Sequence, residues 1–169
     1  VPVKEIYGLL TECKWNTDGA VYSRRDHKWY VLNKEMAKGD FGEAPCSENF
    51  DVHTGEYQAW VENGDIMGAF FAHDHNNNFV GKSADGIVMG YNGGTGFRAY
   101  GAKCGRTIRV FNLDENDVTN YETHLIYYNE LMGESASNPF FDTFSPSILN
   151  KIMKVFYAMF GWAINLFKK

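Results

Sequence analysis

Short apolar runs separated by polar, glycine-rich stretches occupy the middle of the chain, which is the pattern of strands joined by loops. Four such runs predict strands, at residues 65–72, 86–91, 106–113 and 120–131. Because no helical period interrupts these runs, they predict a β-meander, with an acidic turn before the last strand. A short helix precedes them, so the predicted fold class is α+β.

This helix is predicted at residues 54–64. Thr54 can cap its start and Gly64 can end it. Apolar residues at i, i+3 and i+4 from Tyr57 give it one apolar face. The preceding stretch, 11–50, is polar and punctuated by glycine and proline, so we expect an irregular excursion with a short strand or packed turn inside it.

A second helix is predicted at 145–169, where Ser145 and Pro146 form a start signal. Its surface is mostly apolar, and three roles stay open for it. It can pack on the domain's own sheets, lie in a membrane interface, or cross a membrane. The Ser-, Asn-, Gly- and Pro-rich stretch 133–144 predicts a linker, which separates this helix from a domain at 1–132.

Composition narrows the classes of function. The chain has 169 residues, 44% of them hydrophobic, and a net charge of −5 without a long basic run. This argues against a nucleic-acid binder, which concentrates Lys and Arg on one face. The three cysteines, Cys13, Cys46 and Cys104, are widely spaced, which argues against a disulfide framework or a zinc knuckle.

Candidate chemistry lies just beyond the first predicted strand, at His73 and His75. Two histidines at i and i+2 in a loop at a strand end can direct both imidazoles into one pocket. Transition metals prefer imidazole nitrogen together with carboxylate oxygen, and Asp74 lies between the histidines. Asn77, one of the amides that follow, can hold such ligands in place. Glu43, Glu48 and Asp51 lie in the excursion, which can overhang this site, although nothing in their spacing marks them.

The segment 65–79, which contains Ala72-His73-Asp74-His75-Asn76-Asn77, resembles the last signature of calcineurin-like metallophosphoesterases. The resemblance is nearest to the branch related to purple acid phosphatases. Residues 91–101 are similar to the glycine-rich turn that follows in that branch, and 106–111 to its closing strand. Together with the first residues of the chain, the resemblance covers about residues 1–131, in order.

The resemblance implies a four-layer α/β/β/α sandwich, of which this chain is the C-terminal half. It implies a binuclear centre of divalent or trivalent Fe, Mn or Zn that activates a hydroxide to attack a phosphate ester. His73 would bind one metal and His75 the other, with Asp74 and Asn77 as supporting or pocket residues. Arg98 could face the phosphate of a small-molecule or protein substrate.

The sequence departs from the family pattern in two ways. Ala72 stands where the family has glycine, which requires that φ is not positive there. The family's upstream blocks, Asp-x-His, Gly-Asp-x-x-Asp and Gly-Asn-His, do not occur in the chain. We therefore expect these ligands in a missing N-terminal half, and weak or no metal binding and no phosphatase activity in this chain. The alternative is a non-catalytic binding or membrane-associated module that retains the fold.

Overall fold

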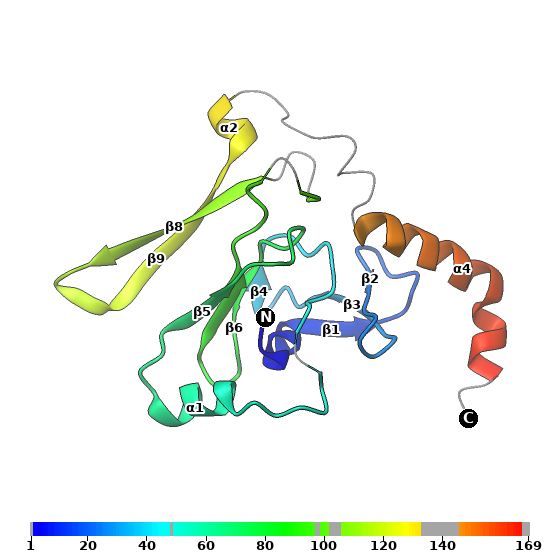
Figure 1. Cartoon of the computed structure of the whole chain (residues 1–169), viewed down its shortest axis with the longest axis horizontal. Helices are drawn as coiled ribbons and strands as arrows, with labels where there is room; N and C mark the ends of the chain where they lie inside the picture. Colours follow the sequence, from blue (N-terminus) through cyan, green and yellow to red (C-terminus); the bar gives the residue numbers. More distant parts are fainter. Residues whose placement is uncertain (1, 48, 97–98, 102–105, 133–145, 167–169) are drawn as a thin grey trace.

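The computed structural model describes residues 2–47, 49–96, 99–101, 106–132 and 146–166. It is a mixed α+β structure, as the sequence predicted, with several small sheets and few helices (Figure 1). The elements are the 3-10 helix η1 (Lys4–Leu9), the strands β1 (Leu10–Cys13), β2 (Val21–Tyr22), β3 (Trp29–Leu32) and β4 (Ala37–Lys38), the helix α1 (Glu56–Asn63), the strands β5 (Gly68–Phe71), β6 (Val80–Lys82), β7 (Val88–Tyr91), β8 (Thr107–Asp114) and β9 (Asp117–Tyr127), and the helices α2 (Tyr128–Met132) and α4 (Pro146–Leu166).

The first sheet is antiparallel, with strand order β1-β3-β2. It lies mostly within the stretch 11–50 that was expected to be irregular, so this expectation is corrected. Of the short strand or packed turn expected inside this stretch, the structure has the strand, β3, which is central in the sheet. Its partners are two to four residues long, too short for a period of alternating residues to stand out in the sequence.

The second sheet has strand order β4-β6-β7-β5. Its β5 and β7 strands, both predicted, are parallel neighbours, so a simple β-meander is wrong for this part of the chain. The cause is β6, which the sequence did not reveal because its residues, Val80-Gly81-Lys82, form no apolar run. β6 pairs antiparallel with one edge of β7, and β5 therefore occupies the other edge.

The strands β8 and β9 form a two-stranded antiparallel hairpin that extends from the body of the molecule (Figure 1). Both strands were predicted. Buried Arg109 on β8 attaches the hairpin to the second sheet, because its guanidinium donates to the carbonyls of Tyr91 at 3.1 Å and Asn78 at 2.7 Å. The segment that ends β7 is thereby held against the hairpin.

Both predicted helices form. α1 ends as expected, with Gly64 in the left-handed region at φ 69°. α4 packs against the first sheet: Asn150 accepts a hydrogen bond from the Tyr22 amide at 3.1 Å, and the Tyr157 ring meets Trp29 edge-on. Among the described residues, no helix is long and apolar enough to cross a membrane. The linker predicted at 133–144 lies outside the described residues.

The main core joins the N-terminal segment to the second sheet. η1 and β1 contribute buried Ile6 and Leu9, and β7 contributes Met89 and Tyr91. Phe79, from the segment after the histidines, is also fully buried in this core. Phe71, just before the histidines, packs against the same core. The histidine segment therefore lies between two packed phenylalanines.

Candidate functional site

The loop that follows β5 begins with an unusual backbone conformation. His73 has φ 81°, in the left-handed region, where His, Asn and Asp occur more often than other non-glycine residues. Among the described residues, His27 and His73 are the non-glycine residues with positive φ. The φ of Ala72 is therefore not positive, as an alanine in the place of the family's glycine requires. The conformation at His73 turns the chain out of the strand and leaves most of its imidazole exposed.

Asp74 is buried, and three groups hold its carboxylate. Oδ2 accepts hydrogen bonds from the Tyr91 hydroxyl at 2.7 Å and the Cys46 amide at 3.0 Å. Oδ1 lies 3.3 Å from Nδ1 of His73. This carboxylate raises the pKa of the Tyr91 hydroxyl well above its usual range, in addition to the larger effect of burial. Asp74 is thus fixed in place with one oxygen directed at His73.

Asn77, which is fully buried, anchors the loop 40–46 over the site. Its Oδ1 accepts from the amides of Gly42 at 3.0 Å and Glu43 at 3.2 Å, and its Nδ2 donates to the Glu43 carbonyl at 2.8 Å. Asn78 adds a similar pair of bonds to Asp40. The amides that the sequence marked as supporting groups therefore position a segment some 35 residues earlier in the chain.

Glu43 is the second buried carboxyl group of the site. One oxygen accepts from the Asn76 amide at 2.8 Å, and the other lies 3.1 Å from the Tyr100 hydroxyl. Burial, opposed by these hydrogen bonds and reinforced by the charge of Asp74, raises the pKa of Glu43 from 4.5 to about 7. Glu43 can therefore exchange a proton near neutral pH, as general acids and bases do.

His75 contacts the same tyrosine, Tyr100. Its ring stacks on the Tyr100 ring with centroids 4.6 Å apart, and its Nδ1 lies 2.8 Å from the Tyr100 carbonyl. Because a carbonyl can only accept, the bonded Nδ1 carries a proton, and Nε2 is the ring nitrogen that remains for a metal. Gly94 packs against His75, so the glycine-rich turn lies beside the site as expected.

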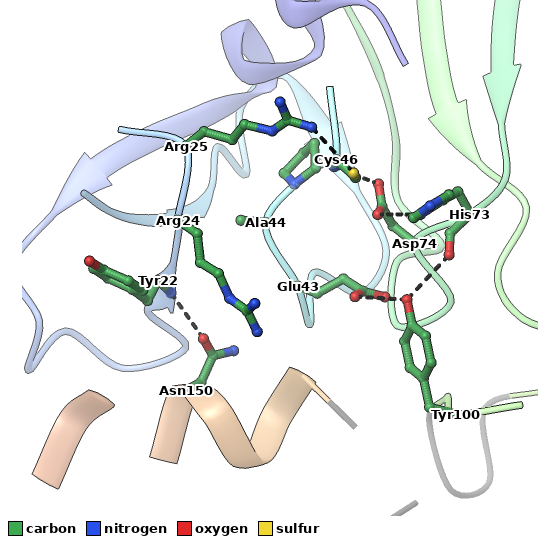
Figure 2. A pocket seen from close by; sticks show the side chains of 11 residues that line it. Tyr22, Arg24, Arg25, Glu43, Ala44, Cys46, His73, Asp74, Tyr100 and Asn150 are labelled. Atoms are coloured by element: carbon green, nitrogen blue, oxygen red, sulfur yellow. Dashed lines mark hydrogen bonds and ion pairs between the residues drawn. The ribbon is translucent and has the colours of Figure 1, made fainter. Parts of the chain in front are cut away.

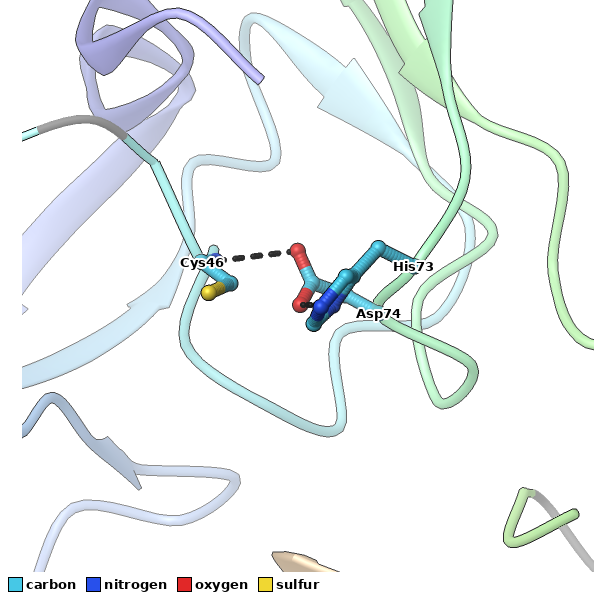
Figure 3. Close-up of side chains that lie close together, drawn as sticks. All are labelled: Cys46, His73 and Asp74. Carbon is cyan, nitrogen blue, oxygen red and sulfur yellow. Dashed lines mark hydrogen bonds and ion pairs between the residues drawn. The ribbon is translucent and has the colours of Figure 1, made fainter. Parts of the chain in front are cut away.

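Three potential metal ligands converge at the other histidine. A nitrogen of His73, an oxygen of Asp74 and the sulfur of Cys46 all lie within 4.8 Å of one another (Figure 3). Nitrogen, oxygen and sulfur are a donor set that zinc accepts. His75 is not part of this group, so among the described residues the two histidines do not share one cluster.

A cavity of about 270 Å³ opens beside this group (Figure 2). Its lining adds Arg24 and Arg25 from the turn between β2 and β3, and Asn150 from α4. Arg25 donates to Asn49 at 2.9 Å and to the sulfur of Cys46 at 3.4 Å. In Figure 2 the Arg24 guanidinium lies between Asn150 and Glu43. The cavity thus combines two cations with potential metal ligands, which suits an anionic ligand.

The sequence indicated some of the residues of this site and not others. It indicated His73, Asp74, His75 and Asn77, which the structure places in one loop, and Arg98, which lies outside the described residues. It did not mark Tyr91, Tyr100 or Cys46. Tyr91 stood at the end of a predicted strand, which is a weak signal, whereas nothing near Cys46 in the sequence indicated a ligand.

The ligand atoms in this chain can be compared with those that a centre of two metal ions needs. Cys46, His73 and Asp74 suit one ion, and Nε2 of His75 suits a ligand of another. Two adjacent dications repel each other and need several anionic ligands. Among the described residues there is one group of three potential ligands, so the residues present fit one ion and part of a second site.

Comparison with known proteins gives a short match. No protein-family model matches the sequence, and no solved structure matches it significantly. A probable inactive purple acid phosphatase 28 from Arabidopsis thaliana is 42% identical over 50 residues. The match covers 30% of this chain and 12% of the plant protein. The chain therefore has a distant link to the purple acid phosphatases.

Proposed function

We propose that this chain contributes to the metal centre of a phosphoesterase-related protein, whose remaining ligands lie in a part of the protein outside this chain. His73 and His75 would each bind one of two transition metal ions of the Fe, Mn or Zn type. The substrate would be a phosphorylated small molecule or protein. The metal ions would supply the activated hydroxide that attacks phosphorus.

The observation that carries this proposal is the environment of His75. Its Nδ1–H is engaged by the Tyr100 carbonyl, which is how proteins orient a histidine that binds metal through the other nitrogen. The stacked Tyr100 ring fixes the plane of the imidazole. The distant link to the purple acid phosphatases supports the broader assignment to a phosphoesterase-related protein.

The residues around the histidines would perform the remaining tasks. Asn77 holds the loop that carries Glu43 over the site. Glu43, whose pKa is about 7, can hold or release a proton at its carboxyl group. Arg24 and Arg25 line the cavity, where their charges would attract a phosphate group.

The proposal predicts that the 169-residue chain alone does not hydrolyse phosphate esters. The physical reason is that one group of three ligands, Cys46, His73 and Asp74, with His75 outside it, offers too few anionic ligands for two adjacent dications. The measurement is release of p-nitrophenol from p-nitrophenyl phosphate by the purified chain with added Zn²⁺, Mn²⁺ or Fe³⁺. Robust turnover that His75→Asn abolishes would contradict the predicted inactivity.

A second candidate is a non-catalytic module that retains the fold and binds ligands. The observation in its favour is that the matched plant protein is itself named as a probable inactive phosphatase. The metal content of the full-length protein, measured by native mass spectrometry, separates the two candidates. Two bound ions per chain support the phosphoesterase, and none supports the non-catalytic module.

A further inference from the structure

Cys46, His73 and Asp74 form a cluster that the proposed binuclear function does not fully use. Cys46 comes from the loop 40–46, and the other two residues come from the loop after β5. The hydrogen bond from the Cys46 amide to Asp74, across 28 residues of sequence, keeps the two loops together. Figure 3 shows the three side chains close together, with the Asp74 carboxylate between Cys46 and His73.

The spacing of two of the donors matches that of two ligands of one metal ion. A charge-assisted bond between imidazole and carboxylate is normally about 2.7–2.9 Å long. Here Nδ1 of His73 and Oδ1 of Asp74 are 3.3 Å apart. Two ligand atoms at about 2.0–2.1 Å from a tetrahedral zinc ion are separated by about 3.3 Å. The pair therefore has the separation of two zinc ligands.

The surroundings hold these donors in place. The second oxygen of Asp74 is bound by the Tyr91 hydroxyl and the Cys46 amide, which leaves the first oxygen for the ion. The Tyr7 hydroxyl donates to the Pro45 carbonyl at 3.0 Å and so fixes the residue before Cys46. His73 adopts a left-handed backbone conformation, at φ 81°, in the loop that follows β5.

We propose that Cys46, His73 and Asp74 bind a single Zn²⁺ ion through sulfur, nitrogen and oxygen. Three protein ligands leave a fourth tetrahedral position open. That position lies beside the cavity lined by Arg24 and Arg25, so a water molecule or an anion can occupy it. The site shares His73 with the proposed function, but it needs neither His75 nor any residue outside this chain.

The test uses Co²⁺ as a spectroscopic substitute for Zn²⁺ in the 169-residue chain. A cobalt–thiolate bond produces an intense charge-transfer band in the near ultraviolet, and tetrahedral cobalt produces strong visible bands. Both are expected on addition of one equivalent of Co²⁺, and both disappear when Zn²⁺ displaces it. Absence of the charge-transfer band in the wild-type chain overturns the proposal.

Matched variants assign the band to the cluster. Cys46→Ser removes it, whereas the double variant Cys13→Ser, Cys104→Ser, in which Cys46 is the remaining cysteine, keeps it. His73→Asn weakens zinc binding at least about tenfold, since loss of a ligand costs no less than loss of a supporting group. A band that survives Cys46→Ser, or that the double variant loses, contradicts the proposal.

His75→Asn separates this proposal from the proposed function. The cobalt band should be unchanged in this variant, because His75 lies outside the cluster. Loss of the thiolate band in His75→Asn, with the fold intact by circular dichroism, would overturn the single-ion site. The number of ions bound by the full-length protein tests the phosphoesterase, whereas the thiolate band of the 169-residue chain tests the single-ion site.

Discussion

At the scale of the residue, the site consists of polar groups buried next to one another. Asp74 and Glu43 are both nearly inaccessible, and each accepts hydrogen bonds from one hydroxyl and one backbone amide. Burial of a carboxyl group disfavours its charged form unless hydrogen bonds or cations compensate. For Glu43 the compensation is incomplete, which leaves its pKa near 7.

The raised pKa predicts a dependence of stability on pH. Because folded Glu43 holds its proton more tightly than the unfolded chain does, its contribution is fully present below about pH 4.5 and is lost as pH rises through about 7. The contribution is at most about 3 kcal/mol. Glu43→Gln should flatten the change in unfolding free energy between about pH 5 and about pH 8, measured with urea.

Glu35→Gln is the matched control, because Glu35 is exposed and makes no side-chain hydrogen bond among those of the described residues. Its pH profile should equal that of the wild type. If Glu43→Gln also equals the wild type, the carboxyl group of Glu43 does not titrate differently in the folded and unfolded states, and its role as a buried acid is refuted.

At the scale of the element, short connections determine the shape of the site. The turn after β7 contains Gly93, at φ 76°, and Gly94, whose amide donates to the His75 carbonyl at 3.2 Å. A side chain on Gly93 would overlap the hydroxyl of Thr107 on β8. The turn thus brings β8 and the His75 loop closer together than any larger residue would permit.

This close approach predicts that Gly93→Ala destabilises the fold. The expected loss of unfolding free energy is about 1–3 kcal/mol, from the left-handed backbone and the contact with Thr107. Gly96→Ala in the same turn should change stability by less than about 0.5 kcal/mol, because a methyl group there meets no atom within 4 Å. Equal effects of the two substitutions in urea unfolding would argue against this packing.

At the scale of the whole molecule, contacts between distant segments close the cavity. Asn150 on α4 bonds to Tyr22, which lies 128 residues earlier, and also lines the cavity. The opposite face of α4 is apolar and exposed, with Phe156 43% and Val155 56% accessible. The inner contacts favour docking on the domain among the three roles that the sequence left open.

Docking of α4 predicts that Tyr157→Ala loosens the helix, because the Tyr157 ring packs against Tyr22 and Trp29. Backbone amides of α4 should exchange with deuterium severalfold faster in this variant, as followed by mass spectrometry. Ile152→Ala, at a position 58% exposed, should leave the exchange unchanged. Equal acceleration in both variants would show that α4 is not held by its inner face.

Some helices and strands could be predicted from the pattern of residues within the element itself. The strands β5, β7, β8 and β9 followed from apolar runs, and α1 and α4 followed from helical period and end signals. The histidine loop could be recognised for the same reason, since its chemistry lies within a few consecutive residues. These features depend on neighbours in sequence, so the sequence by itself determined them.

Only the tertiary structure decided which distant groups meet at that loop. Cys46 and Glu43 reach Asp74 and Asn76 from a stretch without period or motif, through hydrogen bonds that span 28 and 33 residues. The parallel pairing of β5 with β7 depends likewise on β6, a strand too short to be seen in the pattern. Such contacts follow from packing and from the need to satisfy buried polar groups, which no local run of residues encodes.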